Sequence, residues 1–163
     1  MAGECLASAS VWMKALAGAM EETAEAFLGG LRVKTIALST TLPPEFGGAF
    51  IQLVSPHSPV LIGLIGPDNT CYALGRKMLG METDEDLSEP DMTDVMGEII
   101  NVAAGGLKTR LPPEVGAVEL GLPLFLNGSL RASGNVAAEV ATAQIGSHFC
   151  AFLVLSLGGR RAA

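Results

Sequence analysis

One stretch in the second half of the sequence would place polar side chains together on one side of a helix. Residues 90–111 have helical periodicity, and successive residues of a helix are about 100° apart. With that spacing, the polar side holds a single strip: Asp91, Asp94, Glu98, Asn101, Gly105 and Lys108. The opposite side is apolar and consists of Met92, Val95, Met96, Ile99, Ile100, Ala103 and Leu107. The strip therefore offers carboxylate charge and the hydrogen-bonding groups of a carboxamide to another molecule.

The simplest interpretation of such a strip is a solvated helix face, but two of its features argue against it. Asn101 is unfavourable inside a helix, because its side chain competes for backbone hydrogen bonds. Gly105 and Gly106 each cost the helix about 1 kcal/mol relative to alanine. Ser88, followed three residues later by Asp91, otherwise gives this helix a well-capped start. We therefore expect another molecule to approach the helix backbone closely at the glycines.

Other kinds of chemical site have little support in the sequence. It contains no zinc motif of the H-E-x-x-H type and no calcium-binding loop, so we expect no metal site. Ser39, Thr40 and Ser129 have no neighbouring base motif, which argues against a hydrolytic triad. The acidic run at 82–94 has two interpretations: a solvated loop and helix cap, or added negative charge for a basic patch on a partner.

Composition and charge exclude several classes of protein. The chain has 163 residues, of which 49% are hydrophobic and 17% charged, and its net charge is −7. These values exclude a disordered chain and argue against nucleic acid as a partner. They favour a protein partner with positive charge near its contact site.

The sequence also predicts a cytoplasmic location. No apolar run reaches the ~20 residues of a membrane span, so we expect no membrane association. Glu4 and Lys14 interrupt the N-terminal segment, which we interpret as a helix rather than a signal peptide. The three cysteines are odd in number and widely separated, which is typical of reduced thiols in a cytoplasmic protein.

The expected elements follow in the order α-β-β-β-α-α-β-β-β. Helices are predicted at 5–28, 68–79 and 90–111, and strands at 31–40, 49–54, 60–65, 117–126, 135–144 and 148–157. Asn127-Gly128 and Gly146 are expected to form turns. Short connections between strands indicate an α+β fold with a mainly antiparallel sheet and long helices packed on it. We find no repeat or linker and expect a single domain over residues 1–163.

The polar strip also carries a resemblance to a known family. The segment EIINVAAG at 98–105 resembles the E-x-x-N-x-x-x-G signature of the CheC/CheX/FliY chemotaxis phosphatases. The order of elements matches over about residues 5–157. The segment PDNTCYALGRKMLG at 67–80 is similar to the family's proline-started helix before an acidic loop. A single E-x-x-N per chain resembles CheX rather than CheC, which carries two.

This resemblance implies a phosphatase that acts on the phospho-aspartate of a phosphorylated CheY-like response regulator. It implies that Asn101 orients the attacking water and that Glu98 pairs with the lysine by which response regulators hold the phosphoryl group. Gly105 would let the regulator's backbone come close, and Asp94 and Lys108 are predicted to contact the same partner. We expect no cofactor in this chain, because the regulator supplies its own Mg²⁺.

The resemblance also implies a homodimer, and the strands give some support. Strands 60–65 and 149–155 are apolar on both faces, whereas an antiparallel sheet usually leaves one face to solvent. We therefore expect a sheet that is covered twice, by helices on one face and with a second subunit as a candidate cover for the other. The dimer surface is expected to lie away from Glu98 and Asn101.

Two alternatives to the enzyme remain open from the sequence. The chain could be a binding module that docks a response regulator or a flagellar component without hydrolysis, or a structural dimer domain in a signalling assembly. The presence of both Glu98 and Asn101 favours the phosphatase over these alternatives.

Overall fold

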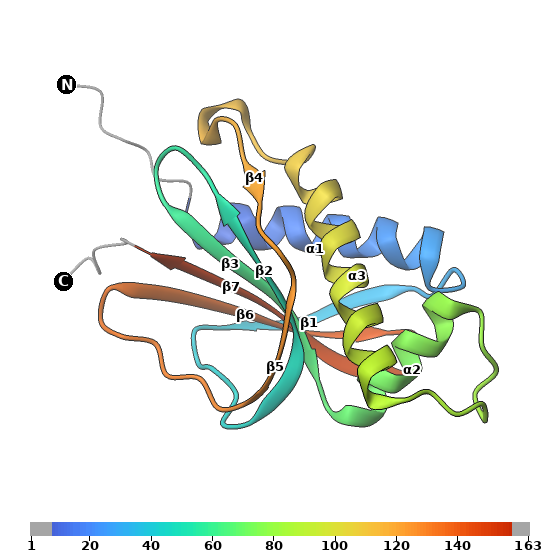
Figure 1. The fold of residues 1–163 in the computed structure, drawn as a ribbon. Coiled ribbons are helices and arrows are strands. Elements are labelled where there is room, and N and C mark those ends of the chain that lie inside the picture. The colour runs from blue at the N-terminus through green and yellow to red at the C-terminus, as the bar shows by residue number, and fades with distance from the viewer. Residues whose placement is uncertain (1–7, 158–163) are drawn as a thin grey trace, which may run out of the picture.

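A computed structural model, which describes residues 8–157, places a seven-stranded sheet against three α-helices (Figure 1). The helices are α1 (Ala9–Phe27), α2 (Asp68–Leu79) and α3 (Glu89–Lys108), with a 3₁₀ turn at Pro113–Val115. The strands are β1 (Val33–Ser39), β2 (Phe46–Val54), β3 (Pro59–Gly66), β4 (Glu119–Leu120), β5 (Leu124–Gly128), β6 (Val136–Ile145) and β7 (His148–Leu157). Cys5 and the first residues of the predicted N-terminal helix lie outside the described residues.

The sheet consists of antiparallel pairs in the order β1-β6-β7-β3-β2-β4, and β5 also pairs with β2. This order shows an internal repeat that the sequence does not reveal. Each half has a helix, an edge strand and a hairpin: α1-β1-β2-β3 and α3-β5-β6-β7. The edge strand of each half pairs with the hairpin of the other half, and β3 pairs with β7 at the centre. The predicted α+β fold with an antiparallel sheet is thus confirmed.

Glycines end the elements where the sequence predicts ends. Gly80 caps α2 in the left-handed conformation, with φ of 66°. Gly29 and Gly30, with φ of 68° and 73°, follow the end of α1. Gly146, with φ of 60°, lies in the two-residue turn between β6 and β7. Because other residues rarely adopt positive φ, these positions fix the ends of their elements.

The segment after α3 differs from the prediction. The predicted strand 117–126 is interrupted, because Pro123 has no N–H to donate to a sheet. Two short strands replace it, β4 and β5, and both pair with β2. Asn127-Gly128 is not a hairpin turn: Asn127 pairs with Gly47 inside β5. The chain then continues through 129–135 to β6 in the other half of the sheet.

Helix α3 also ends earlier than predicted, at Lys108 instead of residue 111. The Thr109 hydroxyl donates to the Gly106 carbonyl at 2.8 Å, and the Arg110 N–H donates to the Leu107 carbonyl at 2.9 Å. These bonds tighten the last turn. Leu111 precedes a proline, and that position disfavours helical backbone.

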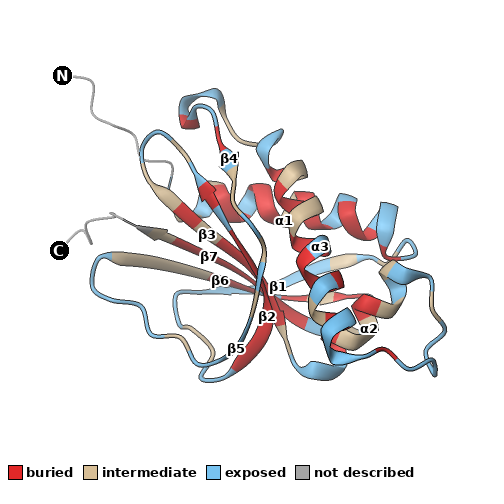
Figure 2. Cartoon of the chain, viewed as in Figure 1, coloured by how far each residue is buried: buried red, intermediate tan, exposed pale blue. Residues whose placement is uncertain are grey.

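Most residues of the central strands are buried (Figure 2). Their apolar side chains form clusters on both faces of the sheet, as the composition of β3 and β7 predicts. One face packs against the helices through residues such as Ile62, Leu64 and Phe152. The other face holds a smaller cluster centred on Phe50 and Leu153. Leu42 and Leu130, from the β1–β2 and β5–β6 connections, pack against this second cluster. The chain's own connections therefore cover much of the face for which a second subunit was a candidate.

No helix in the described part of the chain is long and apolar enough to span a membrane.

Because the second face of the sheet is largely covered, the exposed apolar side chains at the sheet edge are the candidate contact for the predicted homodimer. Ile36 and Leu38 on edge strand β1 are 51% and 64% exposed, and a two-fold pairing would bury them. We predict a dimer of about twice 16.8 kDa at micromolar concentration, measured by light scattering. Replacing both Ile36 and Leu38 by lysine should give a monomer, whereas Phe27→Lys, also at an exposed apolar residue, should not. A wild-type monomer at all concentrations would contradict the prediction.

Candidate functional site

The first turn of α3 is held as its sequence predicts. The Ser88 hydroxyl oxygen accepts a hydrogen bond from the Asp91 N–H at 3.2 Å, and the same hydroxyl donates to the Asp91 carboxylate at 2.7 Å. Glu89 and Asp91 place negative charge at the positive end of the helix dipole. The cap fixes where the helix begins, and so it helps to fix which residues face solvent.

The predicted orientation of α3 is confirmed. All seven residues of its predicted apolar side are buried: Met92, Val95, Met96, Ile99, Ile100, Ala103 and Leu107. They belong to the core cluster between the helices and the sheet, or lie at its edge. Burial of each valine, leucine, isoleucine or methionine side chain among them contributes about 1.5–3 kcal/mol. The side that faces away from the core is therefore strongly determined.

The predicted site residues all lie on that outward side. Asp94, Glu98 and Lys108 are exposed, and Asn101 and Gly105 are half-buried. Glu98 and Asn101 are three residues apart, which places them as neighbours on the helix surface. Within residues 8–157, neither of their side chains has an ion pair or a side-chain hydrogen bond. A carboxylate and a carboxamide one turn apart are thus free to bind another molecule.

The two adjacent glycines of α3 have different surroundings. A Cβ atom added at Gly106 would lie 3.5 Å from the Cβ of Ala19, an ordinary van der Waals contact, so alanine would fit here but a larger side chain would meet α1. A Cβ added at Gly105 would meet no atom of residues 8–157 within 4 Å. Packing against α1 therefore limits the size of the side chain at position 106, whereas no described residue limits it at position 105. At Gly106 the neighbouring helix α1 does not require a glycine, because alanine would also fit there. At Gly105 the close approach expected from the sequence remains a prediction about another molecule.

Helix α1 offers no second site of the same kind. If the two halves of the fold are aligned on the contact between Gly106 and Ala19, the α1 positions that match Glu98, Asn101 and Gly105 are Val11, Lys14 and Gly18. These residues have neither the carboxylate nor the carboxamide. This agrees with the single E-x-x-N found in the sequence.

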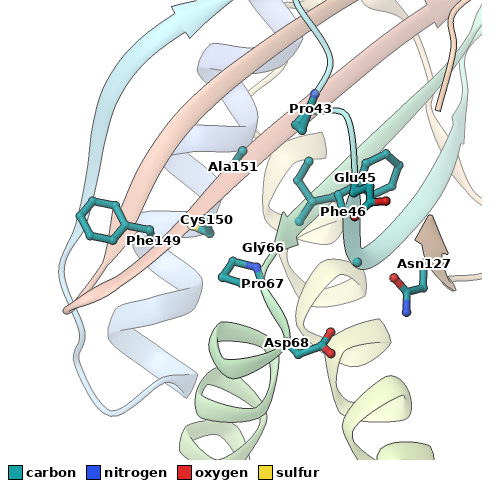
Figure 3. A pocket seen from close by; sticks show the side chains of 12 residues that line it. Pro43, Glu45, Phe46, Gly66, Pro67, Asp68, Asn127, Phe149, Cys150 and Ala151 are labelled. Carbon is teal, nitrogen blue, oxygen red and sulfur yellow. The ribbon is translucent and has the colours of Figure 1, made fainter. Parts of the chain in front are cut away.

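The strip lies on the surface of α3. A cavity at the start of α2 is separate from it (Figure 3). That cavity has a volume of about 450 Å³, and its lining includes Pro67 and Asp68 on one side and Phe46 across from them. None of its lining residues belongs to α3. This cavity therefore places no group beside Glu98 and Asn101.

The buried thiols do not supply a nucleophile. Burial, with a smaller effect of the Asp68 charge, raises the pKa of Cys71 to about 11. Burial raises the pKa of Cys150 to about 12. Both thiols are protonated at neutral pH, and the thiolate is the reactive form. The described residues also contain no cluster of three or more His, Cys, Asp or Glu side chains that could hold a metal ion.

The environments of the two glycines predict opposite effects of the same substitution. Gly106→Leu should lower the free energy of unfolding by about 1–3 kcal/mol, because the larger side chain forces α1 and α3 apart. Gly105→Leu should leave it unchanged or raise it by up to about 1 kcal/mol, because leucine favours helix. Urea denaturation measures both. A comparable loss in Gly105→Leu would show that Gly105 is packed inside and that the orientation assigned to α3 is wrong.

Known structures share this fold at low sequence identity. The CheX chemotaxis protein of Vibrio vulnificus has a TM-score of 0.72 and 15% identity, over 89% of this chain and 98% of that one. CheX in a CheX–CheY–BeF₃–Mg²⁺ complex from Borrelia burgdorferi has a TM-score of 0.68 and 12% identity, over 91% and 98% of the two chains. The FliM middle domain of Vibrio alginolyticus has a TM-score of 0.61 and 13% identity, over 90% of each.

No curated protein sequence matches the chain. The family model described as "Chemotaxis phosphatase CheX" matches residues 48–145, which is more than half of the sequence and includes the whole of α3. The chain therefore belongs to the CheX family of chemotaxis proteins.

Proposed function

We propose that this protein is a phosphatase that accelerates hydrolysis of the phospho-aspartate of a CheY-like response regulator. One observation carries the proposal: Glu98 and Asn101 lie one turn apart on the outward side of α3, with free side chains, in a chain of the CheX family. The Borrelia burgdorferi complex, in which a protein of this fold is bound to CheY with BeF₃ and Mg²⁺, supports the choice of partner.

The proposed reaction needs few groups from this chain. An acyl phosphate is already activated, so the partner has only to place a water in line with the leaving oxygen and to favour the reactive geometry. A carboxamide suits this task because it both donates and accepts hydrogen bonds. Asn101 is the group we assign to orient the attacking water. Neither a covalent intermediate nor a metal ligand from this chain enters the scheme.

Glu98 has a different role in the proposal. It would form a charge-assisted hydrogen bond with the lysine by which the regulator holds its phosphoryl group. Its position, one turn before Asn101, would bring both side chains into the regulator's site from the same helix surface. Gly105, with no atom close to its missing side chain, would leave room for the regulator's backbone.

The proposal places Mg²⁺ in the response regulator and no cofactor in this chain. Mg²⁺ neutralises charge on the phosphoryl oxygens during transfer. We also place the protein in the cytoplasm, where two-component regulators act. A homodimer with its contacts on β1 would leave the α3 strip of each subunit open to one regulator.

A binding module without hydrolysis is the alternative, and the shared fold of the FliM middle domain is the observation that favours it. Such a module would bind the regulator at the same surface but would not turn it over. Catalytic turnover therefore distinguishes the two functions.

Asn101→Ala should lower the rate of dephosphorylation at saturating regulator by about 100-fold or more, because a misplaced water loses in-line geometry. The measurement is decay of the radiolabelled phospho-regulator after phosphorylation by acetyl phosphate. The fold should be retained, since the side chain is on the outward side of α3 and alanine favours helix more than asparagine does.

Glu98→Gln is the matched variant for this test. It removes a charge from the same surface and should act mainly on the affinity for the regulator. Normal turnover by Asn101→Ala would remove Asn101 from the mechanism.

A further inference from the structure

Two grooves border the first half of the α3 strip, one on each side. The groove towards α2 has a volume of about 550 Å³ and is lined by Met78, Leu79, Asp91, Asp94, Val95 and Glu98. The groove towards β5 has a volume of about 500 Å³, and its lining includes Thr93, Asp94, Gly97, Pro123 and Leu124. Asp94 lines both grooves and so stands on the ridge between them.

Each groove is accompanied by exposed apolar side chains. Leu79, in the last turn of α2, is 51% exposed. On the other side, Leu122 and Leu124 are 84% and 60% exposed. They flank Pro123, whose Cβ would lie 3.4 Å from a Cβ added at Gly97. Apolar area on both sides of a polar ridge is typical of a surface that a protein partner covers.

The charge of both grooves is negative and is not neutralised by nearby cations. Among residues 8–157, no Lys, Arg or His lines either groove. Of the two basic residues in the last turn of α2, Arg76 is bonded to a backbone carbonyl and the Lys77 stem lies beside Gly29. Arg76 donates to the Glu85 carbonyl at 2.8 Å, and the Lys77 side chain reaches within 3.7 Å of the Cβ position of Gly29. In the described part of the chain, Asp94 has no ion pair.

From these observations we infer that the grooves hold the response regulator, through a basic side chain that binds Asp94 and apolar side chains that cover Leu79 and Leu124. This inference rests on the proposed function, because the grooves are continuous with the strip that carries Glu98 and Asn101. The inference assigns different roles to the two halves of the strip. The half around Asn101 acts on the phosphoryl group, and the half around Asp94 selects the regulator.

The test separates affinity from turnover. Asp94→Asn and Leu79→Ser should each raise KM for the phospho-regulator, and Kd for the beryllofluoride-loaded regulator, by about fivefold or more. The value of kcat should stay within about twofold, because neither side chain reaches the reacting atoms. Glu21→Gln on α1 and Phe27→Ser at its end are matched controls at exposed positions, and they should change nothing. The dependence of Kd on salt should be weaker for Asp94→Asn than for wild type.

The outcomes distinguish this inference from the proposed function. Unchanged KM and Kd in both variants, with normal turnover by wild type, would overturn the inference and leave the phosphatase intact. Weakened binding in both variants, with no turnover by wild type, would support the docking surface and overturn the phosphatase. Failure of wild type to bind any of the host's CheY-like regulators would overturn both. Circular dichroism of each variant checks that a loss of binding is not a loss of fold.

Discussion

Burial of one side of α3 is the constraint on which the rest of the site depends. Seven apolar side chains of this helix lie in or against the core, and Gly106 lies beside Ala19 of α1. If α3 were rotated about its axis so that Asn101 pointed elsewhere, several of those side chains would be exposed to water. Each exposure would cost a free energy of about 1.5–3 kcal/mol. The outward direction of Glu98 and Asn101 is therefore set by packing on the opposite side of the same helix.

The resulting site lies on a helix surface, and this suits the proposed chemistry. A response regulator would bring the acyl phosphate, the acidic pocket and the metal ion. This chain would have only to present a carboxamide and a carboxylate with fixed spacing, and a helix held by its core does that with little loss of entropy. The repeated arrangement of the two halves provides a second helix of similar placement, α1, but its matching residues Val11 and Lys14 lack these groups. One chain therefore offers one strip of this kind among the described residues.

Local signals in the sequence predicted the helices and their orientation well. The periodicity of α3, the Ser88 cap and the Gly80 end of α2 act within a few residues, so they can be read without knowledge of the fold. The strands β4 and β5 were wrongly predicted as one, although Pro123 was a sufficient local signal for the break. The exchange of edge strands between the two halves could not be predicted, because it pairs residues far apart in sequence, such as Phe50 with Leu124. The grooves beside Asp94 could not be predicted either, because they form only when α2 and β5, which are distant in sequence, lie along α3.

Multiple turnover is the most direct test of the central claim that the α3 strip catalyses dephosphorylation of a regulator. Each CheY-like regulator of the host would be phosphorylated, and its decay would be followed with this protein at about one tenth of the regulator's concentration. The account predicts that for at least one regulator the whole phosphorylated pool decays faster, in proportion to the amount of this protein added. Decay that is unchanged for every regulator, or altered only when the protein is equimolar, would contradict catalysis and indicate a binding module.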